Sequence, residues 1–239
     1  MGTTTAEPTK TVPGKNLSRD AIVHTALHFI DRDGAQGLTM RSLAKEFDVV
    51  PMALYRYVHG REDLLEAVVA LLLERVRLDL DDELAGTCWQ GYLQTLATSV
   101  RRIAVEHPAA FPLVATRHPS APWLRPPLRS LDLVEHFLET LRGHGFTDNQ
   151  IVGTYRAFSS FLLGNLLLEA ASRGAETSPV EVAFDEGDAH IANRDGQVDL
   201  SDKPETKRLR PLLSEDHSAE EFEIALETLL DRLEMTISQ

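Results

Sequence analysis

The sequence predicts an all-α protein in which an N-terminal three-helix unit precedes a larger helical domain. Apolar residues recur three and four positions apart along most of the 239 residues, which is the spacing of helices with one buried face. Residues that favour helix N-termini stand where these stretches begin, among them Ser18, Thr39 and the pair Thr147 and Gln150. Both patterns indicate helices joined by turns and loops.

The first helix is expected to begin after Ser18, which can cap it, and to end at Asp33 and Gly34. Its buried face is supplied by Ile22, Ala26, Phe29 and Ile30. Residues 1–16, rich in Thr, Pro, Lys and Gly, precede this helix and are predicted to form a disordered N-terminal arm.

Residues 39–61, TMRSLAKEFDVVPMALYRYVHGR, predict two short helices joined by a tight turn. Thr39 can cap the first of them. Asp48 and Val49 form the turn, and Asp tolerates the left-handed conformation better than most residues. Pro51 suits the first position of the second helix, because its φ is already helical and no amide hydrogen is lost.

These two helices have apolar faces that can pack together. Leu43, Ala44 and Phe47 form one stripe on the first helix, and Leu54 and Val58 lie four apart on the second. Two packed helices with a tight turn are typical of a helix-turn-helix, so residues 17–63 are predicted to bind DNA. The alternative is a surface helix pair with an ordinary core and a solvated outer face.

The outer face of the second helix suits a DNA major groove. Met52 and Ala53 can contact thymine methyl groups, while Tyr55, Tyr57 and Arg61 can hold phosphates. The full set of candidate DNA-binding residues is Thr39, Met40, Arg41, Pro51, Met52, Ala53, Tyr55, Tyr57 and Arg61.

The run GLTMRSLAKEFDVVPMALYRYVHGREDLLEAV at residues 37–68 resembles the DNA-binding segment of the tetracycline-repressor family. The preceding LSRDAIVHTALHFIDRDGAQ, residues 17–36, resembles the first helix of that family. The chain departs from the family at Asp48, where glycine is commoner in the turn, and its second helix lacks the polar side chains that often read bases. The resemblance implies a double-stranded DNA operator as partner.

The net charge of −13 at pH 7 argues at first against DNA binding, but its distribution weakens the objection. Between residues 15 and 63 seven bases balance seven acids, so the surplus acid lies downstream. Repulsion from those remote acids is screened beyond about 8–10 Å at physiological salt. Lys10 and Lys15 could reach DNA from the arm, although a solvated tail is the favoured interpretation.

Composition limits the class of protein. At 43% hydrophobic the chain can bury a real core in one domain or two. Residues 158–168 are the most apolar stretch, but Gly164 and Asn165 interrupt it and it is too short to span a bilayer. The N-terminus lacks a secretory signal, and the single Cys88 allows no intramolecular disulfide. A cytoplasmic location without membrane contact is therefore expected.

A long connector helix is predicted over residues 61–80, with acids in its first turn. Further helices are expected from Thr87, as N-cap, to residue 107, over residues 124–144, from Thr147 to about residue 174, and from Ser218 onwards with a capping box to Glu221. The helix after Thr147 is apolar nearly all round, so it must be buried on several sides, within its own domain or against a second copy of the chain.

An acidic insert at residues 175–217 is predicted to be mobile. Its acids suggest a calcium loop, but their spacing lacks the required bidentate Glu, so a solvated acidic loop is favoured. The order of segments over residues 87–237 is similar to the ligand-binding domain of the tetracycline-repressor subgroup. That resemblance implies a small-molecule effector, no cofactor, and a homodimer formed through the last two long helices as a four-helix bundle.

In tetracycline-responsive members of this subgroup, a histidine just before a Thr-Arg pair helps to bind the magnesium-chelated drug. The corresponding position here is Leu113, so tetracycline with its metal is not the expected effector and no metal site is predicted. The candidates to line a pocket form an aromatic, mostly apolar set suited to a hydrophobic ligand. They are Trp89, Tyr92, Phe111, Leu113, Trp123, Phe137, Tyr155, Phe158, Phe161 and Asn165.

The alternative for each of these side chains is an ordinary place in the core. Asn165 is the most informative, because an amide on an apolar helix must find a partner in the core, a ligand or another subunit. The histidines are scattered and no catalytic motif is present, so an enzyme is not predicted. Cys88 could be an activated thiol, but a buried small hydrophobe is favoured.

Together these features predict a ligand-responsive DNA-binding transcriptional regulator. The expected form is a homodimeric repressor that a small hydrophobic molecule releases from a palindromic operator. The alternative is a module that senses a small molecule or a protein, with an activating or vestigial DNA-binding role.

Overall fold

The computed structural model describes residues 17–81, 88–116, 118–175 and 202–237. These residues form helices and no strand, which confirms the predicted all-α fold class. The chain divides into two units, one of Met1–Thr177 with Leu233–Gln239 and one of Ser178–Arg232. The helices are α1 (Arg19–Asp33), α2 (Met40–Glu46), α3 (Pro51–Leu54), α4 (Arg61–Leu80), α5 (Trp89–Glu106), α6 (Phe111–Val114), α7 (Leu131–Gly143), α8 (Asp148–Ser172), α9 (Pro204–Leu213) and α10 (Ser218–Ile237).

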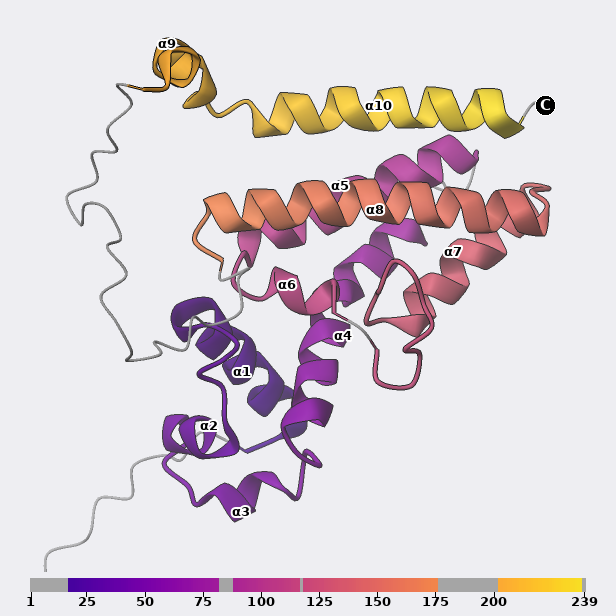
Figure 1. The fold of residues 1–239 in the computed structure, drawn as a ribbon. Helices are drawn as coiled ribbons and strands as arrows, with labels where there is room; N and C mark the ends of the chain where they lie inside the picture. Colours follow the sequence, from indigo (N-terminus) through magenta and orange to yellow (C-terminus); the bar gives the residue numbers. More distant parts are fainter. Residues whose placement is uncertain (1–16, 82–87, 117, 176–201, 238–239) are drawn as a thin grey trace, which may run out of the picture. The chain divides into compact units, whose positions relative to one another are not determined.

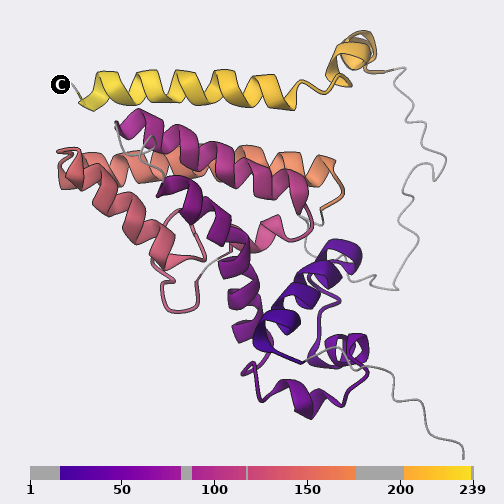
Figure 2. The same ribbon diagram turned by 180° about the vertical axis from the view of Figure 1, so that it is seen from behind.

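Helices α1, α2 and α3 gather around the first half of α4 (Figures 1 and 2). Helix α1 packs against α2 and α4, and α2 packs against α3. The predicted apolar stripes meet in this small core, whose buried members are Ile22, Ala26, Phe29, Ile30, Leu43, Ala44, Phe47, Leu54 and Val58.

The turn between α2 and α3 has the predicted geometry. Asp48 adopts a positive φ of 54°, which an Asp tolerates at lower cost than a branched side chain. Pro51 occupies the first turn of α3, and Val50 before it is extended, with φ −75° and ψ 145°. The α-helix itself is shorter than expected, because it ends at Leu54 and continues only as turns through Tyr57.

Helix α4 runs from these N-terminal helices to the helical domain, as predicted for a connector. It packs against α1 and against α5. Helix α8 then contacts α5, α6 and α7. A buried carboxylate, Glu169, joins α8 to α5 through Arg101, with 2.7 Å between Oε1 and Nη2.

Two helix starts differ from prediction. The helix expected over residues 124–144 begins only at Leu131, where the hydroxyl of Ser130 accepts from the amide of Leu133 at 3.2 Å. Pro126 and Pro127 supply no amide hydrogen for an earlier start and restrict the residues before them.

The second difference lies at the start of α5. Its N-cap is Cys88, whose Sγ accepts from the amide of Gly91 at 3.3 Å. Cys88 is exposed, so the expectation of a buried small hydrophobe is wrong. Thr87, the expected cap, lies outside the described residues.

The second unit contains α9, which falls inside the predicted insert of residues 175–217 and was not anticipated. Pro204 stands in its first turn, a favourable position for proline. Helix α10 begins at Ser218 itself, whose amide donates to the carboxylate of Asp216 at 3.1 Å. The N-terminal arm, residues 1–16, and residues 176–201 of the insert lie outside the described residues.

Helix α8 is long and apolar enough, by length and composition alone, to cross a membrane. No segment was expected to meet that criterion. The core helix of a soluble protein meets it equally well, and 44% of the apolar window of α8 is buried inside the chain.

Candidate functional site

The outer surface of α2 and α3 carries large side chains that the core does not use. Met52 is 72% exposed and Tyr55 is 43% exposed. Arg41 is exposed, whereas Met40, Pro51, Ala53 and Tyr57 are half-buried. This surface therefore presents methyl, hydroxyl and cationic groups, which are the types that contact thymines and phosphates.

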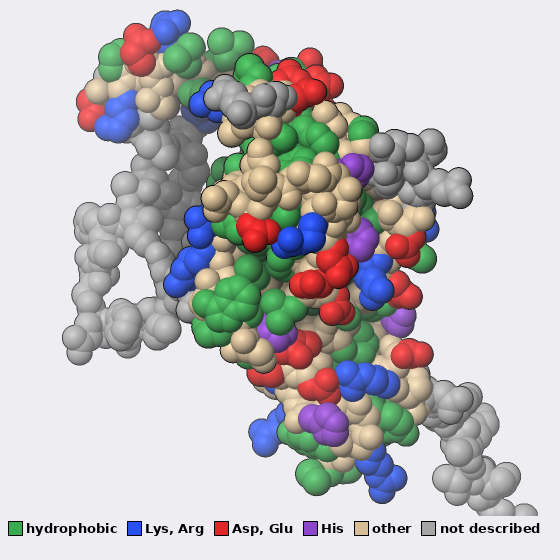
Figure 3. Space-filling view, turned by 90° about the vertical axis from the view of Figure 1, so that its right-hand side faces the viewer, with side chains coloured by type: hydrophobic (Ala, Val, Ile, Leu, Met, Phe, Trp, Pro, Cys, Tyr) green, Lys and Arg blue, Asp and Glu red, His purple; other side chains and the backbone are tan. Residues whose placement is uncertain are grey.

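Three bases on this surface, Arg41, Lys45 and Arg56, are exposed and form no ion pair with any other described residue. Arg41 and Lys45 lie four residues apart on α2 and so project on the same side of the helix. Basic and hydrophobic side chains appear together at this end of the molecule (Figure 3, lower end). Lys45 and Arg56 were not among the candidate residues, although the spacing of Lys45 from Arg41 was a signal for it.

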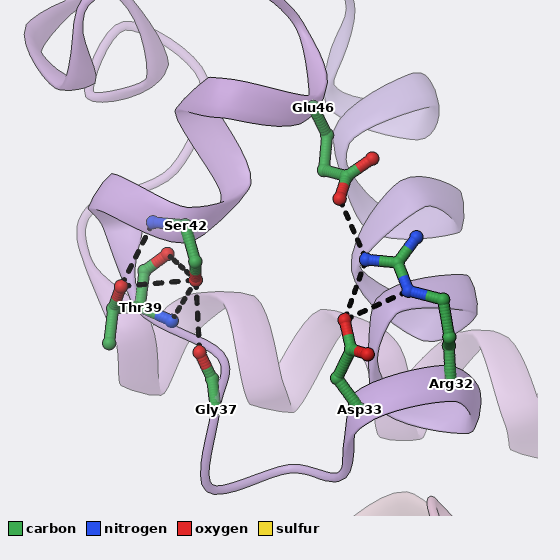
Figure 4. Close-up of polar contacts among 6 residues, drawn as sticks. All are labelled: Arg32, Asp33, Gly37, Thr39, Ser42 and Glu46. Carbon is green, nitrogen blue, oxygen red and sulfur yellow. Dashed lines mark hydrogen bonds and ion pairs between the residues drawn. The ribbon is translucent and has the colours of Figure 1, made fainter.

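Thr39 is held at the N-terminus of α2 by a capping box (Figure 4). Its Oγ1 accepts from the amide of Ser42 at 2.9 Å, and the Oγ of Ser42 accepts from the amide of Thr39 at 2.8 Å. In the same view Arg32 of α1 reaches Glu46 of α2, with 2.8 Å between Nη2 and Oε1. These contacts fix α2 relative to α1, and removal of such a cap costs about 1 kcal/mol.

Arg61 has a different environment from the free bases. Its Nε donates to the carbonyl of Leu38 at 2.9 Å, and its Nη2 donates to the carbonyl of Ala35 at 3.0 Å. The guanidinium therefore holds the loop between α1 and α2 against the start of α4. This bonding restricts the phosphate contact predicted for Arg61, which rested on its position just beyond the helix pair.

Arg19 also braces this unit, a role with no sequence signal because its partners are 38 and 44 residues away. Its Nη1 donates to the carbonyl of Tyr57 at 2.7 Å, and its Nη2 lies 2.9 Å from Oδ1 of Asp63. The hydrogen bond from Arg19 lowers the pKa of Asp63 below the ordinary value of 3.8.

A small apolar cavity of about 30 Å³ lies between α5, α6, α7 and α8. One of its few polar groups, the hydroxyl of Tyr155, donates to the carbonyl of Pro126 at 2.9 Å. Burial raises the pKa of Tyr155 to about 12, so the phenol is neutral at physiological pH. The lining residues are Leu96, Val100, Val114, Leu128, Leu133, Val134, Phe137, Tyr155, Phe158, Ser159, Leu162 and Leu163.

Three of the predicted ligand-binding residues, Phe137, Tyr155 and Phe158, line this cavity. The ring of Phe137 contacts the other two, with centroids 5.7 Å from Tyr155 and 5.8 Å from Phe158. The ring of Tyr92 also packs against Phe137, with the two ring centroids 6.2 Å apart. The hydroxyl of Tyr92 lies 3.1 Å from Nδ1 of His136. The cavity is therefore bordered by an aromatic cluster.

The remaining candidates do not line the cavity. Trp89 packs edge-on against Phe146 at 5.5 Å, and Phe111 and Leu113 belong to α6. Phe161 is half-buried.

Two candidates lie at the surface. Trp123 is 72% exposed in the proline-rich segment before α7. Asn165 is exposed and satisfies its amide on its own helix, because Nδ2 donates to the carbonyl of Phe161 at 3.0 Å. The partner expected for this amide in the core, in a ligand or in another subunit is thus supplied by the backbone of its own helix.

Two side-chain contacts join the N-terminal helices to the helical domain. Asp31 of α1 lies 2.9 Å from Nδ1 of His107 at the end of α5. Glu62 in the first turn of α4 lies 2.9 Å from Nη2 of Arg129, a buried residue just before α7. The partners are 76 and 67 residues apart, so local sequence patterns do not reveal them.

The family model described as "Tetracyclin repressor-like, C-terminal domain" matches residues 83–237. The chain belongs to the tetracycline-repressor family. It is a ligand-responsive DNA-binding transcriptional regulator, as the sequence predicted. The relatives that it matches are transcriptional regulators and not enzymes.

This family member is similar to the HTH-type transcriptional repressor DrrR1 of Streptomyces coeruleorubidus, with 27% identity over 95% of this chain and 81% of DrrR1. It is 29% identical to the class D tetracycline repressor protein of Escherichia coli over 67% of this chain and 70% of that protein. Its fold matches the crystal structure of a possible TetR family regulator from Streptomyces coelicolor, with a TM-score of 0.67 and 26% identity over 92% of this chain and 100% of the other.

The acidic side chains of this regulator do not assemble a metal site in the part of the chain that the structure describes. No group of three or more His, Cys, Asp or Glu side chains is arranged there to hold a cation. An open hollow of about 300 Å³ between the end of α4 and α7 does collect acids, including Asp81, Asp132 and Glu139. Arg77 also borders this hollow, and it supplies a positive charge that repels a cation.

Proposed function

We propose that this regulator is a cytoplasmic homodimeric repressor that a small hydrophobic molecule releases from a palindromic operator. The observation that carries the proposal is the path of α4. This helix begins at Arg61, directly after the helix-turn-helix, and packs along α5, whose residues Leu96 and Val100 line the cavity. A change in the cavity wall can therefore move the DNA-binding helices. The name of DrrR1 as a repressor favours repression over activation.

DNA recognition rests on the outer surface of α2 and α3. A dimer offers two copies of α3 to successive major grooves about 34–36 Å apart, or a multiple of that distance. Met52 and Ala53 supply apolar contacts to thymine methyl groups, while Arg41 supplies the hydrogen bonds and charge that these side chains lack. Much of the sequence preference then comes from DNA shape and deformability.

The effector is proposed to enlarge its own site. A cavity of about 30 Å³ admits little more than a water molecule, whereas pockets for small ligands usually occupy about 300–1,000 Å³. An effector that fits only when the wall formed by α6 and α7 moves outward binds the expanded state of the cavity more tightly than the closed state. It shifts the conformational equilibrium by that difference in binding free energy.

The dimer is proposed to form through α8 and α10, the last two long helices. Helix α8 exposes Val152 and Leu168, and α10 exposes Ile224 and Met235. Large apolar side chains exposed on these two helices favour burial against a second copy of the chain.

Nuclease footprinting on the DNA that flanks the regulator's own gene tests the proposal. The expected result is a protected palindrome whose half-sites are one helical turn or a multiple apart. Mass spectrometry of small molecules that co-purify with the protein then identifies the effector, which should abolish the footprint when added back. The absence of any protected palindrome would favour the alternative of a sensing module with a vestigial DNA-binding role.

A further inference from the structure

Arg129 is a buried arginine with an unused donor. Its side chain is only 7% exposed, yet its Nε has no hydrogen-bond partner. Nη1 donates to Oγ1 of Thr116 at 3.2 Å, and Nη2 donates to Oε2 of Glu62 at 2.9 Å. No other buried side-chain nitrogen or oxygen among the described residues is left without a partner. A buried donor without an acceptor is unfavourable and is rare in folded proteins.

The backbone of Arg129 lies next to the wall of the apolar cavity. Leu128, the residue before it, lines the cavity. The amide of Arg129 donates to the carbonyl of Val114 at 3.1 Å, and Val114 also lines the cavity. A molecule that fills this cavity and widens it past Val114 and Leu128 therefore reaches the segment that carries the guanidinium.

The present partner of Arg129 uses only half of one guanidinium edge. A carboxylate binds a guanidinium best through two parallel N–H···O bonds, and Nε and Nη2 form such an edge. Glu62 accepts from Nη2 alone, and its side chain is 65% exposed. Its other oxygen, Oε1, lies 3.6 Å from Nη1 of Arg61. Glu62 can thus leave Arg129 and return to water at small cost.

We propose that the half-used edge of Arg129 binds an acidic group of the effector, which makes the effector an amphiphile with an apolar body and a carboxylate or similarly acidic oxygen. This inference rests on the proposed function of the cavity as the effector site. The body fills the space beside Phe137 and Phe158, and the acid accepts from Nε and Nη2 in place of Glu62.

The exchange keeps the buried charge of Arg129 paired. A neutral effector that displaced Glu62 would leave that charge uncompensated, which is strongly unfavourable. The exchange also breaks the ion pair that joins the first turn of α4 to the helical domain, so the effector's acid both anchors the ligand and releases the DNA-binding helices.

Pairs of ligands that differ only in charge test this inference on the full-length protein. Suitable probes are naphthalene, anthracene and anthraquinone carboxylic acids, each with its primary amide, titrated by isothermal calorimetry. The acids should bind at least about tenfold more tightly than their amides, as expected for a charge-assisted bidentate contact. Arg129→Gln should remove this preference. Arg142→Gln should keep it, because Arg142 pairs with exposed Asp148 on the outer side of α7.

A second variant keeps the test decisive if Arg129→Gln does not fold. Glu62→Gln retains Arg129 but removes its competing carboxylate, so it should raise the affinity for the acids by about threefold or more and leave the amides unchanged. Unchanged or lower acid affinity in Glu62→Gln would contradict the inference. Equal binding of acids and amides, a preference that survives in Arg129→Gln, or no binding of any acid would overturn it as well.

The same samples separate this inference from the proposed function. A footprint on the operator that amides and acids release equally well upholds the regulator and refutes the role of Arg129. The absence of a footprint refutes the proposed repressor, whatever the calorimetry of the acids shows.

Discussion

The free bases of α2 predict how operator affinity depends on salt. Each phosphate that a protein neutralises contributes about 0.9 to the slope of log K against log salt concentration. The proposed dimer carries two copies of Arg41 and two of Lys45, so the double variant Arg41→Ala/Lys45→Ala should lower the slope by up to about 3.6. Because both side chains are exposed and unpaired among the described residues, their removal should leave the fold intact.

The assay is fluorescence anisotropy of a labelled fragment that carries the footprinted operator, titrated at salt concentrations from about 50 to 200 mM. The matched control is Arg32→Ala, which removes an arginine of the same domain whose guanidinium already pairs with Asp33 and Glu46. The control should keep the parent slope. Parallel lines for the double variant and the parent, or an equal decrease in the control, would refute the assignment of these bases to the DNA surface.

Three further outcomes follow from the contacts described above. Arg61→Ala should lower the free energy of unfolding by about 1–3 kcal/mol in urea denaturation, because two backbone carbonyls lose their donor. Unchanged stability would refute the bracing role of Arg61 and leave the phosphate contact as its only proposed role. The Arg19 hydrogen bond lowers the pKa of Asp63, so its stabilisation is complete above the unfolded value near 3.8 and is lost as pH falls through the lower folded value. Asp63→Asn should therefore flatten the loss of stability below about pH 4, measured by urea titrations at several pH values. Burial raises the pKa of Tyr155 to about 12, so Tyr155→Phe should remove one late-ionising phenol from an ultraviolet pH titration of the folded protein, and an unchanged titration would count against its burial.

Much of the helix-turn-helix could be predicted because its determinants are local. The Thr39 cap, the turn at Asp48 and the start at Pro51 each depend on a few neighbouring residues. The bonding of Arg61 could not be predicted in this way, because its acceptors lie 23 and 26 residues back in the sequence. Only the folded arrangement distinguishes an arginine that braces a loop from a free one such as Arg41.

The cavity illustrates a second limit. Helical periodicity identifies buried residues, and Phe137 and Phe158 were correctly expected to be interior. Periodicity does not show which buried residues border an unfilled volume, so the aliphatic lining, such as Val100, was not predicted. Trp123 shows the converse, because a large aromatic that was expected inside lies in a proline-rich segment that exposes it.

Under the proposed function, the tightness of the cavity also sets the dose at which the regulator responds. A ligand that needs an open site binds with an apparent dissociation constant raised by the inverse of the fraction of molecules already open. If about one molecule in a hundred is open, the concentration needed is about a hundredfold higher than the contacts alone would give. If the effector binds there as proposed, close packing around Phe158 makes the protein insensitive to traces of effector, and substitutions that loosen this packing should lower the threshold without adding any contact to the ligand.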